Sequence, residues 1–134
     1  MLAGADARTQ SLRPAPGVWS PLEYAGHCAD VMTWCGERIS RLLTEDAPRF
    51  EPFDWDVHTR RRRYHDMGTR LVLSCLAESS EDLAALLRTL GPREWNRAGT
   101  GSDGTARTVA DLARRAAHEA VHHALDIHAG LHPA

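Results

Sequence analysis

Residues 108–131 read TVADLARRAAHEAVHHALDIHAGL, and this stretch decides the fold class. Thr108 followed three residues later by Asp111 is typical of a helix N-terminus, because each side chain can accept a hydrogen bond from the other residue's backbone amide. Apolar residues then recur at helical spacing along one face, and Gly130 follows the last of them closely. The pattern predicts a long amphipathic helix from Thr108 to about Ala129.

Two further segments show helical spacing. The run SPLE at 20–23 combines a serine cap, a proline at the first helical position and a glutamate three residues after the serine, so it predicts a helix over 21–45. A second long helix is expected over 66–90, before the pair Gly91-Pro92. No segment alternates apolar and polar residues over a useful length, so no strand is expected. Three long helices without a sheet predict an all-α bundle.

The remaining segments predict one domain with an extension. Residues 1–17 are rich in Ala, Gly, Arg and Pro without periodicity, and we interpret them as a loose arm before a single bundle domain over 18–134. Residues 50–65 are expected to form a connection with a short helical turn. The glycine-rich residues 97–106 are expected to form a turn-rich loop.

Charge and composition exclude several classes of function. The formal net charge is -2, which leaves no electrostatic footprint for nucleic acid, and no apolar stretch approaches the roughly 20 residues that span a bilayer. No cationic and apolar leader opens the chain, and the three cysteines form no C-x-x-C pair, so we expect a cytoplasmic protein with reduced thiols. The four arginines at 60–63 could attract an acidic substrate, although such a run is ordinarily a solvated face.

Histidines are concentrated on the last predicted helix, at positions 118, 122, 123 and 128. Two overlapping pairs have the spacing of four with which side chains on one helix face can hold a metal together: His118 with His122, and Glu119 with His123. At about 100° per residue, Glu119 and His123 lie in or at the margin of the apolar face, whereas the other pair lies among charged residues. The pair expected to face the core is therefore Glu119 and His123.

A third ligand is expected from the first long helix, where His27 lies at the edge of the apolar face. Two imidazoles and one carboxylate with open positions are typical of a catalytic metal site. An alternative from the same residues is a metal-free core, in which His123 is hydrogen bonded and Glu119 pairs with Arg38.

Residues 118–122 also match the H-E-x-x-H pattern of metalloproteases, and His128 lies where a third histidine would follow. That pattern needs a glycine that breaks the helix, but this chain has Leu125 there, and on an unbroken helix His128 lies about 15 Å along the axis from His118. A metalloprotease is therefore the weakest alternative.

Two segments together resemble a known family. The run RPAPGVWSPLEYAGH at 13–27, with TVADL at 108–112 and HEAVHHALDI at 118–127, resembles the DinB-like superfamily in its actinobacterial form. That superfamily includes mycothiol-dependent maleylpyruvate isomerases and bacillithiol transferases. The resemblance implies an up-down four-helix bundle, with metal ligands at His27, Glu119 and His123, although His118 remains an alternative for the second ligand. The family's usual first helix is short or missing here, and the groove left uncovered predicts a homodimer.

The resemblance also implies a function. A divalent metal, zinc or nickel in the first place and manganese or iron otherwise, would hold the sulfur of a low-molecular-weight thiol such as mycothiol as a thiolate. The thiolate would attack a small electrophile, giving a thiol S-transferase or isomerase. His122 would move a proton and Asp126 would orient a ligand imidazole. The expected partners are a small-molecule substrate and the thiol, with neither nucleic acid nor membrane. The alternative is a non-catalytic, metal-binding, stress-related helical protein.

Overall fold

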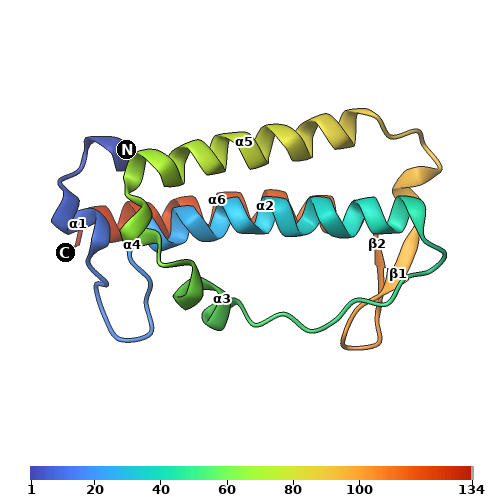
Figure 1. The fold of residues 1–134 in the computed structure, drawn as a ribbon, viewed down its shortest axis with the longest axis horizontal. Coiled ribbons are helices and arrows are strands. Elements are labelled where there is room, and N and C mark those ends of the chain that lie inside the picture. The colour runs from blue at the N-terminus through green and yellow to red at the C-terminus, as the bar shows by residue number, and fades with distance from the viewer. Residues whose placement is uncertain (134) are drawn as a thin grey trace.

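Three long helices form the body of the molecule, as the sequence predicts (Figure 1). The computed structural model describes residues 1–133, so Ala134, the last residue of the expected bundle domain, lies outside the described residues. In chain order the elements are η1 (Leu2–Gly4), α1 (Ala7–Ser11), α2 (Pro21–Thr44), α3 (Trp55–Arg62), α4 (Tyr64–Met67), α5 (Thr69–Arg88), η2 (Glu94–Asn96), β1 (Ala98–Thr100), β2 (Ala106–Thr108) and α6 (Val109–Leu131).

The caps found in the sequence begin two of the long helices. Ser20 Oγ accepts from the backbone amide of Glu23, and the Glu23 carboxylate accepts in return from the amide of Ser20. Thr108 and Asp111 make the same reciprocal pair at the start of α6. Each pair satisfies two amides that have no partner within the helix, and so fixes the residue at which the helix begins.

The helices do not alternate in direction, which differs from the expected up-down order. Val72 at the start of α5 packs with Leu22 at the start of α2, and Leu83 packs further along with Met32, so α2 and α5 run parallel. Only α6 runs back, as Figure 1 shows. A helix with the 24 residues of α2 is about 36 Å long, and residues 45–68 are enough chain to return that distance before α5 begins.

The returning connection carries α3 and α4 across one face of α2 (Figure 1). The ring of Tyr64 is buried against the backbone of α2, and a Cβ at Gly26 would overlap that ring. Glycine at this position therefore allows the connection to approach α2 directly beside His27.

The first residues differ from the expected loose arm, because η1 and α1 fold against the end of the bundle. Leu2 is buried in a cluster with Leu22 and Ile127, and Gln10 donates from its Nε2 to the carbonyls of Leu2 and Ala5. With five residues, α1 is much shorter than the three long helices.

A two-stranded hairpin replaces part of the expected loop. β1 and β2 pair in antiparallel fashion, and each has three residues, too few to show alternation in the sequence. Phe50 donates its amide to the carbonyl of Thr100, which in turn donates its amide to the carbonyl of Pro48. The hairpin therefore holds the start of the returning connection at the far end of α2.

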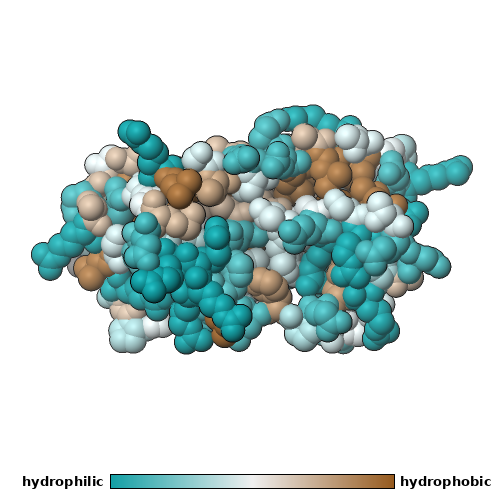
Figure 2. All heavy atoms as spheres, viewed as in Figure 1, coloured by the Kyte–Doolittle hydropathy of each residue, from teal (hydrophilic) through white to brown (hydrophobic). Residues whose placement is uncertain are grey.

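Part of the apolar surface is uncovered. Figure 2 shows hydrophobic residues gathered over the side of α5 toward its C-terminal end, where a groove between α2 and α5 is lined by Met32, Leu83 and Leu86. On α6, the side chains of Val121 and Leu125 are exposed. Among the described residues, no helix is long and apolar enough to cross a membrane.

Candidate metal centre

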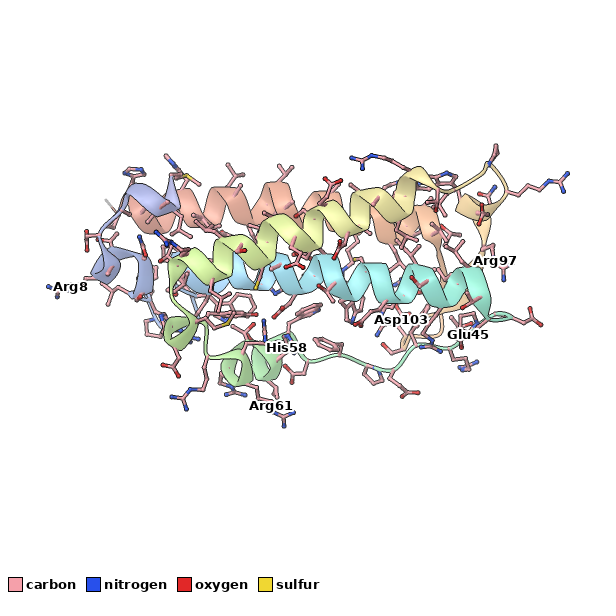
Figure 3. The ribbon with its side chains drawn as sticks, turned by 45° about the horizontal axis from the view of Figure 1, so that its top comes forward. Arg8, Glu45, His58, Arg61, Arg97 and Asp103 are labelled. Atoms are coloured by element: carbon pink, nitrogen blue, oxygen red, sulfur yellow. The ribbon has the colours of Figure 1, made fainter. Side chains whose placement is uncertain are left out.

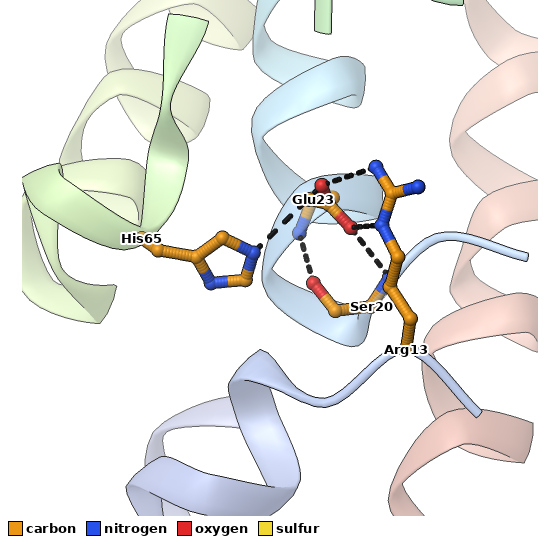
Figure 4. Close-up of polar contacts among 4 residues, drawn as sticks. All are labelled: Arg13, Ser20, Glu23 and His65. Atoms are coloured by element: carbon orange, nitrogen blue, oxygen red, sulfur yellow. Dashed lines mark hydrogen bonds and ion pairs between the residues drawn. The ribbon is translucent and has the colours of Figure 1, made fainter. Parts of the chain in front are cut away.

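The start of α2 is anchored by a buried carboxylate (Figure 4). Arg13 donates from Nε and Nη2 to the two oxygens of Glu23, at 2.9 and 2.6 Å, and Ser20 donates its amide at 2.9 Å. His65 Nε2 approaches the same carboxylate at 3.7 Å. Burial alone would raise the pKa of Glu23, but the bonds from Arg13 and Ser20 outweigh it and the pKa is lowered. This network fixes the register of α2 one turn before His27.

His27, in the second turn of α2, is buried, with its ring 4.7 Å from that of His123 on α6. Burial, and then the nearby His123, lower the pKa of His27 to about 4, so its imidazole is neutral at pH 7. A neutral imidazole keeps the lone pair that a metal ion requires.

Glu119 lies between the two histidines. Its Oε2 is 2.8 Å from His123 Nε2 and 3.5 Å from His27 Nε2, and the ligand atoms of the three residues all lie within 4.8 Å of one another. Burial would raise the pKa of Glu119, but His123 and His27 outweigh it and the pKa is lowered. Two imidazole nitrogens and one carboxylate oxygen are the donor set of many catalytic zinc sites, so these residues fit a divalent cation.

Asp126 holds the other side of the His123 ring. Its Oδ2 lies 2.8 Å from His123 Nδ1 and 3.6 Å from Nε2 of His122, whose side chain is 58% exposed. When His123 Nδ1 donates to Asp126, its Nε2 is free to face Glu119 and His27 with a lone pair. A carboxylate on the far nitrogen is the usual partner of a metal-binding histidine.

Aromatic rings surround the three residues. Trp19 and Trp55 lie 4.9 and 4.8 Å from the ring of His27, and Tyr24 stacks on His123 at 5.0 Å with an interplanar angle of 27°. These rings limit the access of water to the cluster and hold both imidazoles in place.

A second polar network, which the sequence does not reveal, supports this wall. Asp30 on α2 accepts from Tyr64 Oη and from Arg62 Nε at 3.0 Å, and its Oδ2 lies 2.9 Å from His58 Nε2. Arg61, one residue before Arg62, points away from the bundle (Figure 3). The network fixes α3 against α2. It thereby places Trp55, at the start of α3, beside the cluster of His27, Glu119 and His123.

The alternatives derived from the sequence are arranged differently. His118 is exposed, its ring lies 5.8 Å from that of His122, and it belongs to no group of three metal-binding side chains among residues 1–133. The Glu119–Arg38 pair of the metal-free alternative is not formed. Arg115, one turn before Glu119, approaches it at 4.0 Å instead, and Arg38 donates to the carbonyl of Glu51.

The three cysteines are free. Burial is the main cause that raises the pKa of Cys28 to about 12 and that of Cys35 to about 11. Both are therefore thiols rather than thiolates at neutral pH, and behave as small apolar core residues.

Comparisons with known proteins agree with the fold. A family model of the DinB superfamily matches residues 2–127. Among solved structures, YfiT from Bacillus subtilis, described as a probable metal-dependent hydrolase with an unusual four-helix bundle topology, is similar with a TM-score of 0.76. The two sequences are 22% identical, and the match covers 94% of this chain and 70% of that chain. No curated protein matches the sequence significantly.

Proposed function

This chain belongs to the DinB superfamily, and on that basis we propose that it is a divalent-metal-dependent enzyme that activates a small nucleophile. The observation that carries the proposal is the convergence of His27, Glu119 and His123 from two helices, with their ligand atoms within 4.8 Å of one another. Zinc or nickel suits two imidazoles and a carboxylate best, and manganese or iron is an alternative.

A metal with three protein ligands and open positions lowers the pKa of a bound thiol or water, and so supplies a nucleophile at neutral pH. The chain's own groups do the rest. Asp126 orients His123, and the neighbouring aromatic rings exclude bulk water. His122 is half exposed and 3.6 Å from Asp126, so it is placed to exchange a proton with solvent.

The first candidate reaction is transfer of a low-molecular-weight thiol such as mycothiol to an electrophile, or isomerisation assisted by that thiol. Its support is the resemblance of the 13–27, 108–112 and 118–127 segments to the DinB-like superfamily, which includes thiol-dependent enzymes. The second candidate is hydrolysis, and its support is the description of YfiT, whose fold is similar. The same ligand set serves both, because thiol and water are activated in the same way.

The test begins with the metal content of untagged protein, measured by elemental mass spectrometry. We expect about one divalent ion per chain in the wild type and in His122→Ala, and none in His123→Ala. His122→Ala is a matched control, because it removes the neighbouring imidazole from the same turn. The cobalt(II) form, titrated with 2-mercaptoethanol, should then develop a thiolate-to-metal absorption band.

Three outcomes separate the candidates. A thiolate band together with thiol-dependent loss of an electrophile such as 1-chloro-2,4-dinitrobenzene supports thiol transfer. Hydrolysis of an activated amide or ester by the metal-loaded protein, without a thiolate band, supports a hydrolase. Absence of metal from the wild type, even after incubation with zinc, nickel and manganese, would reduce the protein to a helical scaffold without this chemistry.

A further inference from the structure

A pocket of about 570 Å³ lies next to the cluster of His27, Glu119 and His123. It is bounded by α2, α6, the 50–55 segment and the hairpin loop. Two of its lining residues contact the cluster directly. The Trp55 ring lies 4.8 Å from that of His27, and Arg115 Nε lies 4.0 Å from Glu119 Oε1. A molecule in this pocket therefore lies beside any reacting group at the cluster.

The pocket wall is largely aromatic. Trp34 and Phe53 pack on Trp55 with ring centroids 5.6 and 4.5 Å away, and Phe50 and Leu112 complete the apolar lining. Such a wall suits the flat, apolar body of a small organic molecule.

Two guanidinium groups lie over one of these rings. Arg38 and Arg115 place their Cζ atoms 4.0 and 4.7 Å from the centroid of Trp34. The hydrogen bond of Arg38 goes to a backbone carbonyl, that of Glu51, and Arg115 comes no nearer than 4.0 Å to Glu119. Burial, and then the charges of Arg115 and Arg41, lower the pKa of Arg38, which is the sign of a crowded positive site.

Two of the three acidic residues that line the pocket have arginine partners. Asp103 accepts from Arg107 at 3.0 Å, and Asp111 accepts from Arg114 at 3.0 Å as well as capping α6. Arg38 and Arg115 differ from the other arginine of the lining, Arg107, because within residues 1–133 neither donates a hydrogen bond to a carboxylate. Their guanidinium groups can therefore donate to the carboxylate of a bound molecule.

We propose that this pocket binds the carboxylate of a small organic molecule that reacts at the metal cluster, with Arg38 and Arg115 holding the carboxylate and the aromatic wall its apolar body. The planar guanidinium matches a carboxylate in shape and charge. Arg115 precedes Glu119 by one helical turn and lies 4.0 Å from its carboxylate, so the bound carboxylate is held next to the three-residue cluster. The reaction rests on the proposed function, but the binding needs no metal.

Binding is tested on metal-free protein by calorimetric titration with benzoate and with its uncharged analogue benzamide. Benzoate should bind at least about tenfold more tightly, because only a charged partner uses both guanidinium groups. Arg38→Gln and Arg115→Gln should each weaken benzoate binding about tenfold, and Arg115→Lys by less, because it keeps the charge but not the planar shape. Arg61→Gln is the matched control, since it removes an exposed arginine of the 60–63 run, and should change binding less than about twofold.

The result separates this site from the metal proposal. Benzoate should bind equally well to His123→Ala, which cannot hold the metal, so the pocket can be confirmed even where the proposed catalysis fails. Circular dichroism of each variant shows that the helices are intact. Absence of benzoate binding to the wild type, or equal binding in Arg38→Gln, Arg115→Gln and Arg61→Gln, overturns the proposal.

The carboxylate can come from the electrophile or from the thiol, and the cobalt(II) protein distinguishes the two. If Arg38→Gln and Arg115→Gln weaken the binding of 3-mercaptopropionate but not of 2-mercaptoethanol, the pocket holds the carboxylate of the thiol. If both thiols bind these variants as they bind the wild type while benzoate binding is lost, the pocket holds the carboxylate of the electrophile. Both results support an anion site.

Discussion

Glu23 and Glu119 both lie close to histidines, but their other partners differ. Glu23 at the start of α2 receives two hydrogen bonds from Arg13 and one from the amide of Ser20, with His65 at 3.7 Å. Glu119 on α6 has its Oε2 close to two imidazole nitrogens, and its nearest arginine is 4.0 Å away. The first carboxylate has a permanent positive partner, whereas the second has none in direct hydrogen-bond contact.

This difference separates a structural anchor, Glu23, from a candidate metal ligand, Glu119. Both oxygens of Glu23 accept from Arg13, which remains charged at all physiological pH values, and one also accepts from the amide of Ser20, so the network holds α2 in place. At the other carboxylate, His27 is neutral at pH 7 because burial lowers its pKa to about 4. The negative charge of Glu119 is therefore available to a cation, and the proposed divalent metal would supply more charge there than the neighbouring imidazoles.

The largest effect should come from removing each carboxylate in turn. Glu119→Gln should weaken zinc binding about 1000-fold, or about 4 kcal/mol, because one of three ligands loses its charge. Glu23→Gln should leave the zinc affinity within about threefold, because it changes the anchor and not the donor set. Competition titration with a chromogenic chelator measures both. Equal losses in the two variants would show that Glu119 acts on the metal only through the fold.

The next effect concerns the stability of the metal-free protein at low pH. Protonation of His27 is favoured in the unfolded chain, where its pKa is near 6.5, and disfavoured in the fold, where it is about 4. The unfolded state therefore binds more protons between these values, and stability falls as pH falls from about 6.5 to about 4, by about 3 kcal/mol in total.

His27→Gln removes this term, so its urea unfolding midpoint should change less between pH 7 and pH 4 than that of the wild type. Other acidic groups titrate in both proteins, and the difference between the two isolates the histidine. Identical pH dependence would mean that His27 is protonated as easily in the fold as in the unfolded chain.

Removing Arg13 from the Glu23 anchor should change the free energy of unfolding by less than the protonation of His27 does. Arg13→Met leaves the buried Glu23 carboxylate without its charged partner. We expect the free energy of unfolding to fall by about 2 kcal/mol at pH 7, which is less than for a fully buried ion pair because Arg13 is half exposed. The pKa of Glu23 is lowered in the fold, so this stabilisation is present above about pH 4.5 and is lost as pH falls further. Urea unfolding at pH 7 and pH 3 should show the difference between the proteins shrinking. A constant difference would assign the loss to packing by the arginine side chain.

The comparison also shows what the sequence predicts well. The caps at 20–23 and 108–111 are local, because all their partners lie within three residues, and both are confirmed. The face of α6 is also local, since helical spacing alone separates Glu119 and His123 from His118 and His122. The structure brings Glu119 and His123 to His27 and leaves His118 exposed.

The features that the sequence does not predict depend on long-range packing. The parallel direction of α5 follows from where the 45–68 connection crosses α2, and no local pattern encodes it. Asp30 becomes a bridge only because that connection brings His58, Arg62 and Tyr64 to it. Arg115 replaces Arg38 beside Glu119 because it lies on the same helix, and Arg38 lies further along α2 over Trp34.

The smallest effect should come from the carboxylate that touches the cluster only through His123. Asp126 lies 2.8 Å from His123 Nδ1, so Asp126→Asn removes a charge that raises the basicity of the imidazole and fixes its ring, and zinc affinity should fall about tenfold. His122→Asn changes the neighbouring side chain, which faces solvent and donates nothing to the three-residue cluster, so zinc affinity should stay within about twofold. If His122 exchanges protons during turnover, the same variant should alter the pH profile of kcat while leaving metal content intact. An affinity loss in His122→Asn equal to that in Asp126→Asn would instead place the ion in the alternative group of His122, His123 and Asp126, and would move the metal centre from the buried core toward the solvent-facing side of α6.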